Sequence, residues 1–149
     1  MNSEINKVGF FVIGARKCAT TWLYQNLLLN PSVLLSTEVK ESNYFSNKYD
    51  EGLDWYHSLF PATWNGRVAG EVDTSLLYSS EAVDRIWKYN SEAKIVVLVR
   101  NPVEQFRSSY LHAYRKGDLT CSASEAWDQN KIFQQEVTYS KFLTPWVNK

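Results

Sequence analysis

Three short apolar runs, each the length of a β-strand, constrain the fold of this chain more than any other feature. They occupy residues 8–13, 67–72 and 94–99, and the first and third are rich in β-branched or aromatic residues without alternating polar ones. Such runs are typical of strands that are covered on both faces. Segments with helical spacing lie between and after them. The alternation predicts an α/β fold with a mainly parallel central sheet, flanking helices and right-handed crossovers.

The expected helices cover residues 20–29, 80–89 and 139–147, with others starting near Pro102 and Ser122. Ser122 and Glu125 have the spacing of a capping box. In the helix after Pro102, the apolar stripe consists of Val103, Phe106, Tyr110 and Ala113. The opposite, polar stripe consists of Gln105, Ser108, His112 and Arg115. We therefore expect that helix to bury the first stripe and expose the second.

Composition indicates one soluble domain over residues 1–149. Hydrophobic residues make up 44% of the 149, including 6 Trp, 9 Tyr and 7 Phe, which is enough to build a core and excludes general disorder. Sixteen basic residues balance sixteen acidic ones, so no overall field favours nucleic acid or an anionic membrane as partner. Two cysteines and two histidines cannot form a typical zinc cluster, and no metal site is expected. The N-terminus lacks the features of a signal peptide, which predicts a cytoplasmic protein of unknown oligomeric state.

Residues 14–21, directly after the first strand, have the composition of a phosphate-binding loop: Gly14, Ala15, Arg16, Lys17, Cys18, Ala19, Thr20 and Thr21. A loop that opens a helix directs N–H groups at an anion, and Lys17 and the threonine hydroxyls can add charge and hydrogen bonds. The loop is not a Walker A sequence, which requires a second Gly before the Lys. On spacing alone, a strand–turn–helix connection with a solvated Lys17 is an equally good interpretation.

A second candidate site follows the third strand. Arg100 leaves the carboxyl end of that strand, where open α/β sheets place their ligands, and Ser108 follows two helical turns later. Both could bind one phosphate group. An arginine on the surface and a serine on a polar helix face would give the same pattern.

Together these residues resemble the sulfotransferases that use 3′-phosphoadenosine 5′-phosphosulfate (PAPS), especially the bacterial and heparan-sulfate-type branch. Residues 14–21 are similar to the family's 5′-phosphosulfate loop, G-x-x-K-x-G-T-T, except that Ala19 replaces a Gly. Residues 97–102 with Ser108 are similar to its 3′-phosphate motif. The resemblance implies a three-layer P-loop-like fold, with PAPS as co-substrate held by residues 14–21, Arg100 and Ser108.

Residues 40–45 resemble the family's K-E-x-x-F/Y-F segment, which implies that Glu41 is the catalytic base and acts together with Lys17. A surface carboxylate paired with Lys40 is the alternative for Glu41. Residues 54–61 and 70–78 also resemble family segments, although Trp55 and Tyr56 are interpreted first as core residues. Family members continue with a further strand and a basic loop, so the resemblance implies that this chain lacks the C-terminal part.

We therefore predict a sulfotransferase that transfers a sulfonate group from PAPS to a hydroxyl or amine of a small-molecule or glycan acceptor, without a metal. Two alternatives stay open at this point. One is a P-loop kinase, which needs an acidic residue at a strand end; Glu71 and Asp73 are the nearest candidates. The other is a non-catalytic nucleotide-binding protein.

Overall fold

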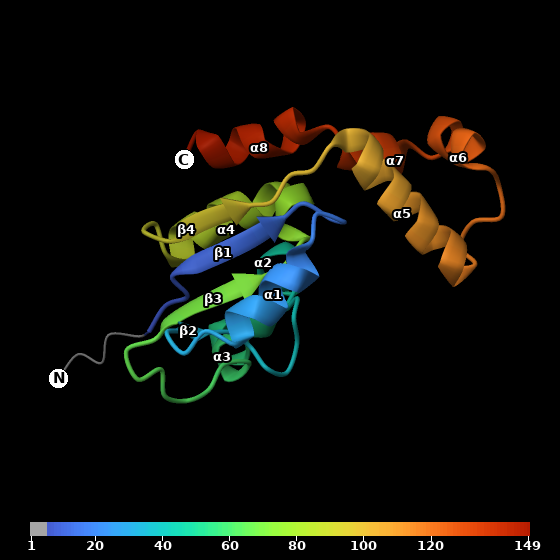
Figure 1. The fold of residues 1–149 in the computed structure, drawn as a ribbon. Helices are drawn as coiled ribbons and strands as arrows, with labels where there is room; N and C mark the ends of the chain where they lie inside the picture. Colours follow the sequence, from blue (N-terminus) through green and yellow to red (C-terminus); the bar gives the residue numbers. More distant parts are fainter. Residues whose placement is uncertain (1–5) are drawn as a thin grey trace.

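The computed structural model of the chain describes residues 6–149 (Figure 1). Within these residues, four strands form one sheet in the order β2-β3-β1-β4. Their bounds are Phe10–Gly14 for β1, Val33–Leu34 for β2, Val68–Val72 for β3 and Lys94–Val97 for β4. Every pairing is parallel, with Phe10 opposite both Gly70 and Lys94. The predicted α/β fold is confirmed, and β2 is a short strand that the apolar runs did not indicate.

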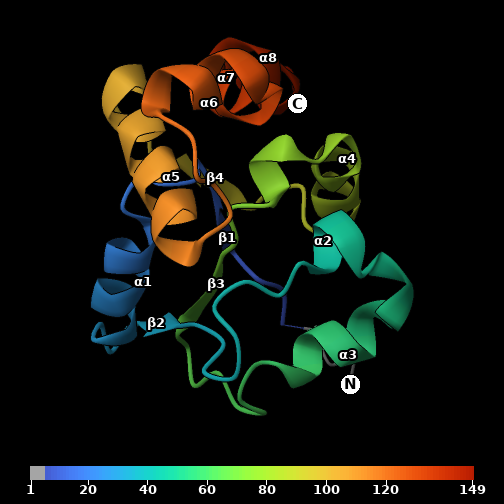
Figure 2. The same ribbon diagram turned by 90° about the vertical axis from the view of Figure 1, so that its right-hand side faces the viewer.

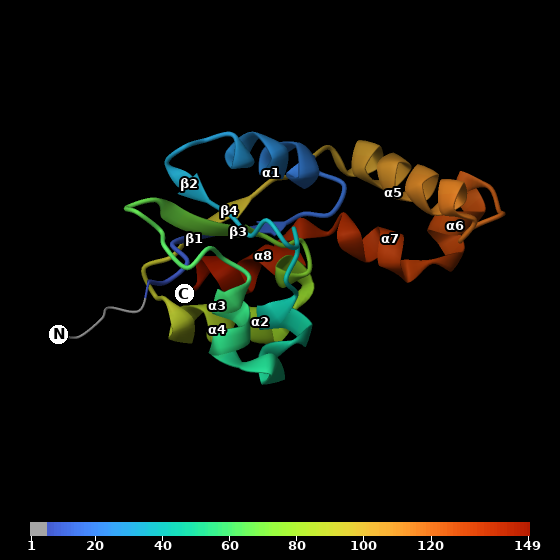
Figure 3. The same cartoon turned by 90° about the horizontal axis from the view of Figure 1, so that it is seen from below.

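The helices lie on both faces of this sheet, which gives the three layers visible in Figure 3. Their bounds are Thr20–Leu28 (α1), Tyr44–Asn47 (α2), Gly52–Ser58 (α3), Ser80–Tyr89 (α4), Pro102–Lys116 (α5), Ala123–Gln129 (α6), Lys131–Glu136 (α7) and Tyr139–Val147 (α8). Single 3₁₀ turns span Tyr49–Glu51 and Leu76–Tyr78. Helix α1 covers one face, α2, α3, α4 and α8 cover the other, and α5, α6 and α7 extend beyond the carboxyl ends of the strands (Figures 1 and 3).

Aromatic side chains fill the core between the sheet and the α2–α4 layer. Phe11 of β1 meets Phe45 of α2 edge to face with ring centroids 5.4 Å apart, and Tyr44 stacks on Tyr56 at 4.7 Å. All four side chains are essentially inaccessible to solvent. The interpretation of Tyr56 as a core residue is confirmed, and burial on this scale supplies most of the driving force for the fold.

Two expectations about burial were wrong. Strand β4 is not covered on both faces: Ile95 and Val96 are 37% and 38% exposed, because β4 lies at the edge of the sheet and few elements pack against it. In α5, Val103 of the apolar stripe is 71% exposed, whereas Gln105 of the polar stripe is fully buried. Gln105 can be buried because its amide is fully hydrogen-bonded, as described below.

The helix termini follow the local sequence signals. The hydroxyl of Ser79 accepts a hydrogen bond from the N–H of Ala82 at the start of α4, and Asn101 caps α5 ahead of Pro102. Ser122 and Glu125 form the predicted capping box of α6. Within residues 6–149, no helix is long and apolar enough to cross a membrane.

Candidate active site at the carboxyl end of the sheet

The loop that joins β1 to α1 has a strained backbone conformation. Lys17 and Ala19 have φ angles of 60° and 63°, in the left-handed region that favours glycine. Ala19 is the N-cap of α1, and its side chain makes no capping hydrogen bond. The first N–H groups of α1 therefore face the loop without a side-chain partner, which is the arrangement that binds anions.

Glycine is required at the start of this loop. A Cβ atom on Gly14, whose φ is 145°, would lie 3.1 Å from the Cβ of Leu77 and 3.7 Å from the carbonyl oxygen of Thr74. The phosphate-loop backbone therefore packs directly against the segment that follows β3. Ala15 and Cys18 are buried within the loop, whereas Arg16 and Ala19 are exposed.

Lys17 lies partly buried between charges of both signs. Burial lowers the pKa of its ammonium group, nearby Glu136 raises it, and Lys116 of α5 lowers it. Glu136 also forms an ion pair with Arg16, at 3.4 Å from the guanidinium NH1 to the carboxylate Oε1. Its other oxygen accepts a hydrogen bond from Ser109 at 3.0 Å. Glu136 thus balances part of the positive charge of the loop.

A buried hydrogen-bond network connects the phosphate loop to the start of α5. The amide Nε2 of Gln105 donates to the carbonyl oxygens of Arg16 (2.8 Å) and Glu136 (3.2 Å). Its Oε1 accepts from the hydroxyl of Tyr139, which in turn accepts from the N–H of Arg100 at 3.1 Å. The same hydroxyl lies 3.6 Å from the Sγ of Cys18. Gln105 and Tyr139 therefore bridge the two segments that the sequence assigned to phosphate binding.

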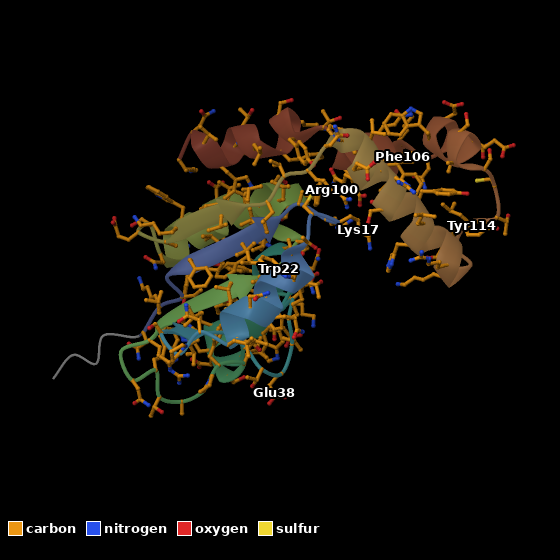
Figure 4. All side chains as sticks on the ribbon, in the orientation of Figure 1. Lys17, Trp22, Glu38, Arg100, Phe106 and Tyr114 are labelled. Atoms are coloured by element: carbon orange, nitrogen blue, oxygen red, sulfur yellow. The ribbon has the colours of Figure 1, made fainter. Side chains whose placement is uncertain are left out.

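Arg100 and Ser108 line one cavity of about 210 Å³, together with Glu104, Arg107 and Leu111. The guanidinium of Arg100 lies 3.4 Å from the carboxylate of Glu104, one helical turn away, and both side chains are nearly half exposed. Such an exposed pair contributes little to stability, so Arg100 is available to an anionic ligand. The structure brings these two predicted residues together in one cavity. Figure 4 shows Arg100 near Lys17, at the same end of the sheet.

Glu41 lies in the segment between β2 and α2 and contacts Thr74, which follows the carboxyl end of β3. Its Oε1 is 2.7 Å from the Nζ of Lys40 and accepts a hydrogen bond from the hydroxyl of Thr74 at 3.2 Å. The pairing with Lys40 that the sequence left open is therefore present. Figure 2 looks at the carboxyl ends of the strands, with α1 and α5 on one side and α2 and α4 on the other.

Two buried carboxylates at the end of β3 were not assigned to the site by the sequence. Glu71 is 4% exposed and Asp73 is fully buried. Burial, and to a lesser degree the charge of Asp73, raises the pKa of Glu71 to about 7, while its hydrogen bonds from Ser42 and Tyr56 oppose that shift. Burial also raises the pKa of Asp73. An acidic residue inside an otherwise apolar strand was the signal that marked Glu71.

Among the described residues, no group of three or more His, Cys, Asp or Glu side chains is arranged to hold a metal ion. Glu71 in β3 and Asp73 directly after it are instead satisfied by hydrogen bonds from the protein. Glu71 accepts from Tyr56 at 2.7 Å, and Asp73 accepts from the N–H of Asn43 at 2.7 Å.

Comparison with known proteins agrees with this geometry. The sulfotransferase domain family matches residues 8–148. The chain is 34% identical over 105 residues to human heparan sulfate glucosamine 3-O-sulfotransferase 6, covering 70% of this chain and 30% of that protein. It is 32% identical over 145 residues to mouse heparan sulfate glucosamine 3-O-sulfotransferase 3B1, covering 91% of this chain and 37% of the relative.

A crystal structure of a sulfotransferase from Alicyclobacillus acidocaldarius has the same fold, with a TM-score of 0.83, 24% identity, and coverage of 97% of this chain and 69% of that one. The α/β fold and the match to the family model therefore define a protein of the P-loop-like sulfotransferase class. The chain belongs to the sulfotransferase domain family. It spans roughly a third of the length of the two curated relatives described above.

Proposed function

We propose that this protein binds PAPS and transfers its sulfonate group to a hydroxyl or amine of an acceptor. The observation that carries the proposal is the position of two candidate anion-binding segments at one end of the sheet, joined by Gln105 and Tyr139. One is the phosphate loop with Lys17, and the other is the cavity with Arg100 and Ser108. A nucleotide that carries phosphates at both its 5′ and 3′ positions suits such a pair of sites.

In the proposed reaction, an acceptor oxygen or nitrogen forms a bond to the sulfur of the donor. The bond from sulfur to the bridging phosphate oxygen breaks, and adenosine 3′,5′-bisphosphate leaves with the electron pair. Lys17 offsets the negative charge that develops on that oxygen. The acceptor proton passes to the carboxylate of Glu41, so Lys17 and Glu41 are the proposed catalytic residues. No metal is assigned a role.

The donor-binding residues in this proposal are residues 14–21, Arg100 and Ser108. Burial of Ala15, Cys18 and Thr20 supports a fixed loop rather than a solvated turn. A glycan acceptor is favoured because the relatives are named as heparan sulfate glucosamine sulfotransferases. A kinase is not favoured, because the family match extends over nearly the whole chain. The cytoplasmic location stays a prediction of the sequence.

Ligand-dependent melting tests the binding half of the proposal. Adenosine 3′,5′-bisphosphate at a hundredfold excess over its Kd should raise Tm by about 5 °C or more, whereas ATP with Mg²⁺ should have a much smaller effect. A larger shift with ATP and Mg²⁺ would support the kinase instead. Absence of any shift with the bisphosphate would contradict the proposed donor.

Transfer of labelled sulfonate tests the chemical half. The labelled donor is incubated with heparan sulfate oligosaccharides and, separately, with 4-nitrophenol, and the labelled product is quantified. We expect label on at least one acceptor, or slow release of inorganic sulfate by transfer to water. Tight binding of the bisphosphate without any transfer would identify a nucleotide-binding protein rather than an enzyme.

A further inference from the structure

The segment that carries Glu41 is held in place from β3. The N–H of Ser42 donates to Oε1 of Glu71 at 3.3 Å, and the hydroxyl of Ser42 bonds to the same oxygen. The next N–H, that of Asn43, donates to Oδ2 of Asp73 at 2.7 Å. Two consecutive backbone N–H groups after Glu41 are thus fixed by buried carboxylates, which is stronger anchoring than neutral loop contacts provide.

The carboxylate of Glu41 itself is held by only one of its oxygens. Oε1 receives both the ammonium of Lys40 and the hydroxyl of Thr74, at 2.7 and 3.2 Å. From residues 6–149, Oε2 receives no hydrogen bond. The arrangement fixes one oxygen and leaves the other free to accept a proton.

Thr74 is the more rigid of the two partners of Glu41. It is 7% exposed, and its β-branched side chain has few rotamers. Its neighbours are also fixed: Asp73 donates its N–H to the carbonyl oxygen of Val12 at 3.0 Å, and its Oδ1 accepts from the N–H of Ser75 at 2.9 Å. Lys40, in contrast, reaches Glu41 through a flexible four-carbon chain.

We infer that Thr74 is a positioning residue for Glu41. Its hydroxyl fixes the orientation of the carboxylate so that Oε2 is presented to the acceptor, and Asp73 fixes the turn from which that hydroxyl acts. This inference depends on the proposed role of Glu41 as the base. Thr74 takes no part in the reaction itself, but it sets the geometry of proton transfer to Glu41.

The test begins with Thr74→Val, which removes the hydroxyl and keeps the branched shape. We expect kcat for sulfonate transfer to fall about tenfold, as for loss of a hydrogen bond to a charged group, while the Kd for adenosine 3′,5′-bisphosphate stays the same. Thr74→Ser restores the hydroxyl and should keep kcat within about twofold of the native value. Thr74→Ala lacks the hydroxyl as well and replaces the valine variant if that one does not fold.

A double-mutant cycle separates this inference from the proposed function. When Glu41 is replaced by Ala, there is no carboxylate to orient, so Thr74→Val should then have no further effect on kcat. A tenfold loss in both backgrounds would overturn the positioning role and leave the base intact. A Glu41→Ala variant with native kcat would instead contradict the proposed base.

The orientation of the Glu41 carboxylate can also be measured without an activity assay. In a crystal structure of Thr74→Val, the Glu41 carboxylate should leave its native rotamer or become disordered, while Ser42 and Asn43 stay bonded to Glu71 and Asp73. A carboxylate that keeps its position on Lys40 alone would overturn the inference.

Discussion

The two sides of the candidate site are built in different ways. On the proposed acceptor side, Glu71 and Asp73 are buried and hold the Glu41 segment through hydrogen bonds. On the proposed donor side, the Arg100 side chain is nearly half exposed and interacts only weakly with Glu104. The difference indicates that the protein itself fixes the segment of the proposed base, whereas the guanidinium of Arg100 stays accessible to a ligand.

The largest effect should come from Lys17, the proposed catalytic cation on the donor side. Lys17→Ala should lower kcat about 10²–10³-fold, because its charge is needed most when the bridging oxygen becomes an anion. The Kd for adenosine 3′,5′-bisphosphate should change much less. Kinetics and calorimetry on the variant measure both quantities, and Lys88→Ala, a charge removed from α4, serves as the control. Native kcat in Lys17→Ala would remove this residue from the mechanism.

Arg100→Ala tests whether the exposed Arg100 side chain binds the 3′-phosphate of the donor. Binding of adenosine 3′,5′-bisphosphate should weaken by about 1.5–3 kcal/mol, the range for hydrogen bonds to charged groups. Adenosine 5′-phosphosulfate, which lacks the 3′-phosphate, should bind the variant and the native protein equally well. Arg115→Ala removes the same charge from the last turn of α5 and should leave both affinities unchanged. Equal losses for the two ligands would mean that Arg100 supports the fold instead.

Burial of Glu71 should make the free energy of unfolding depend on pH. The pKa of Glu71 is about 7 in the folded protein, above its ordinary value of 4.5, so the folded state holds the proton more tightly than the unfolded state. This stabilisation is present at low pH and is lost as the pH rises through 7. The native protein should lose about 2 kcal/mol of unfolding free energy relative to Glu71→Gln between pH 5 and 8.

Urea unfolding at pH 5 and pH 8 measures this difference. Comparison with Glu71→Gln cancels the contribution of His57, whose pKa is lowered by burial and which therefore acts in the opposite direction. The exposed Glu92→Gln variant should follow the native protein at both pH values. If the unfolding free energy of Glu71→Gln also changes with pH as that of the native protein does, Glu71 does not carry the predicted proton.

The smallest effect should come from Tyr139, which connects the two segments proposed to bind phosphate. Tyr139→Phe removes the hydroxyl that bonds to Gln105 and accepts from the N–H of Arg100. Because both segments lose support, affinity for the bisphosphate and for adenosine 5′-phosphosulfate should fall together by about 1 kcal/mol. Tyr110→Phe, which removes a hydrogen bond to Cys121 elsewhere on α5, is the matched control. A loss confined to the bisphosphate would show that Tyr139 acts on the Arg100 site alone.

The sequence by itself determined the α/β alternation, because strands and helices leave different periodicities in the chain. It also located Lys17, Arg100 and Ser108 after the strands that position them, since the carboxyl ends of parallel strands meet at one edge. Pro102 in the first turn of α5 and the capping box of Ser122 and Glu125 were likewise local signals that the structure reproduces.

Only the tertiary structure decided what packs against those elements. Strand β4 reads as a buried strand, but its place at the sheet edge leaves Ile95 and Val96 accessible. Gln105 reads as a surface residue, but partners distant in sequence, Arg16 and Tyr139, satisfy its amide and permit its burial. The same holds for Glu71 and Asp73: their partners Ser42 and Asn43 lie about 30 residues away, and no local pattern encodes hydrogen bonds formed across that distance.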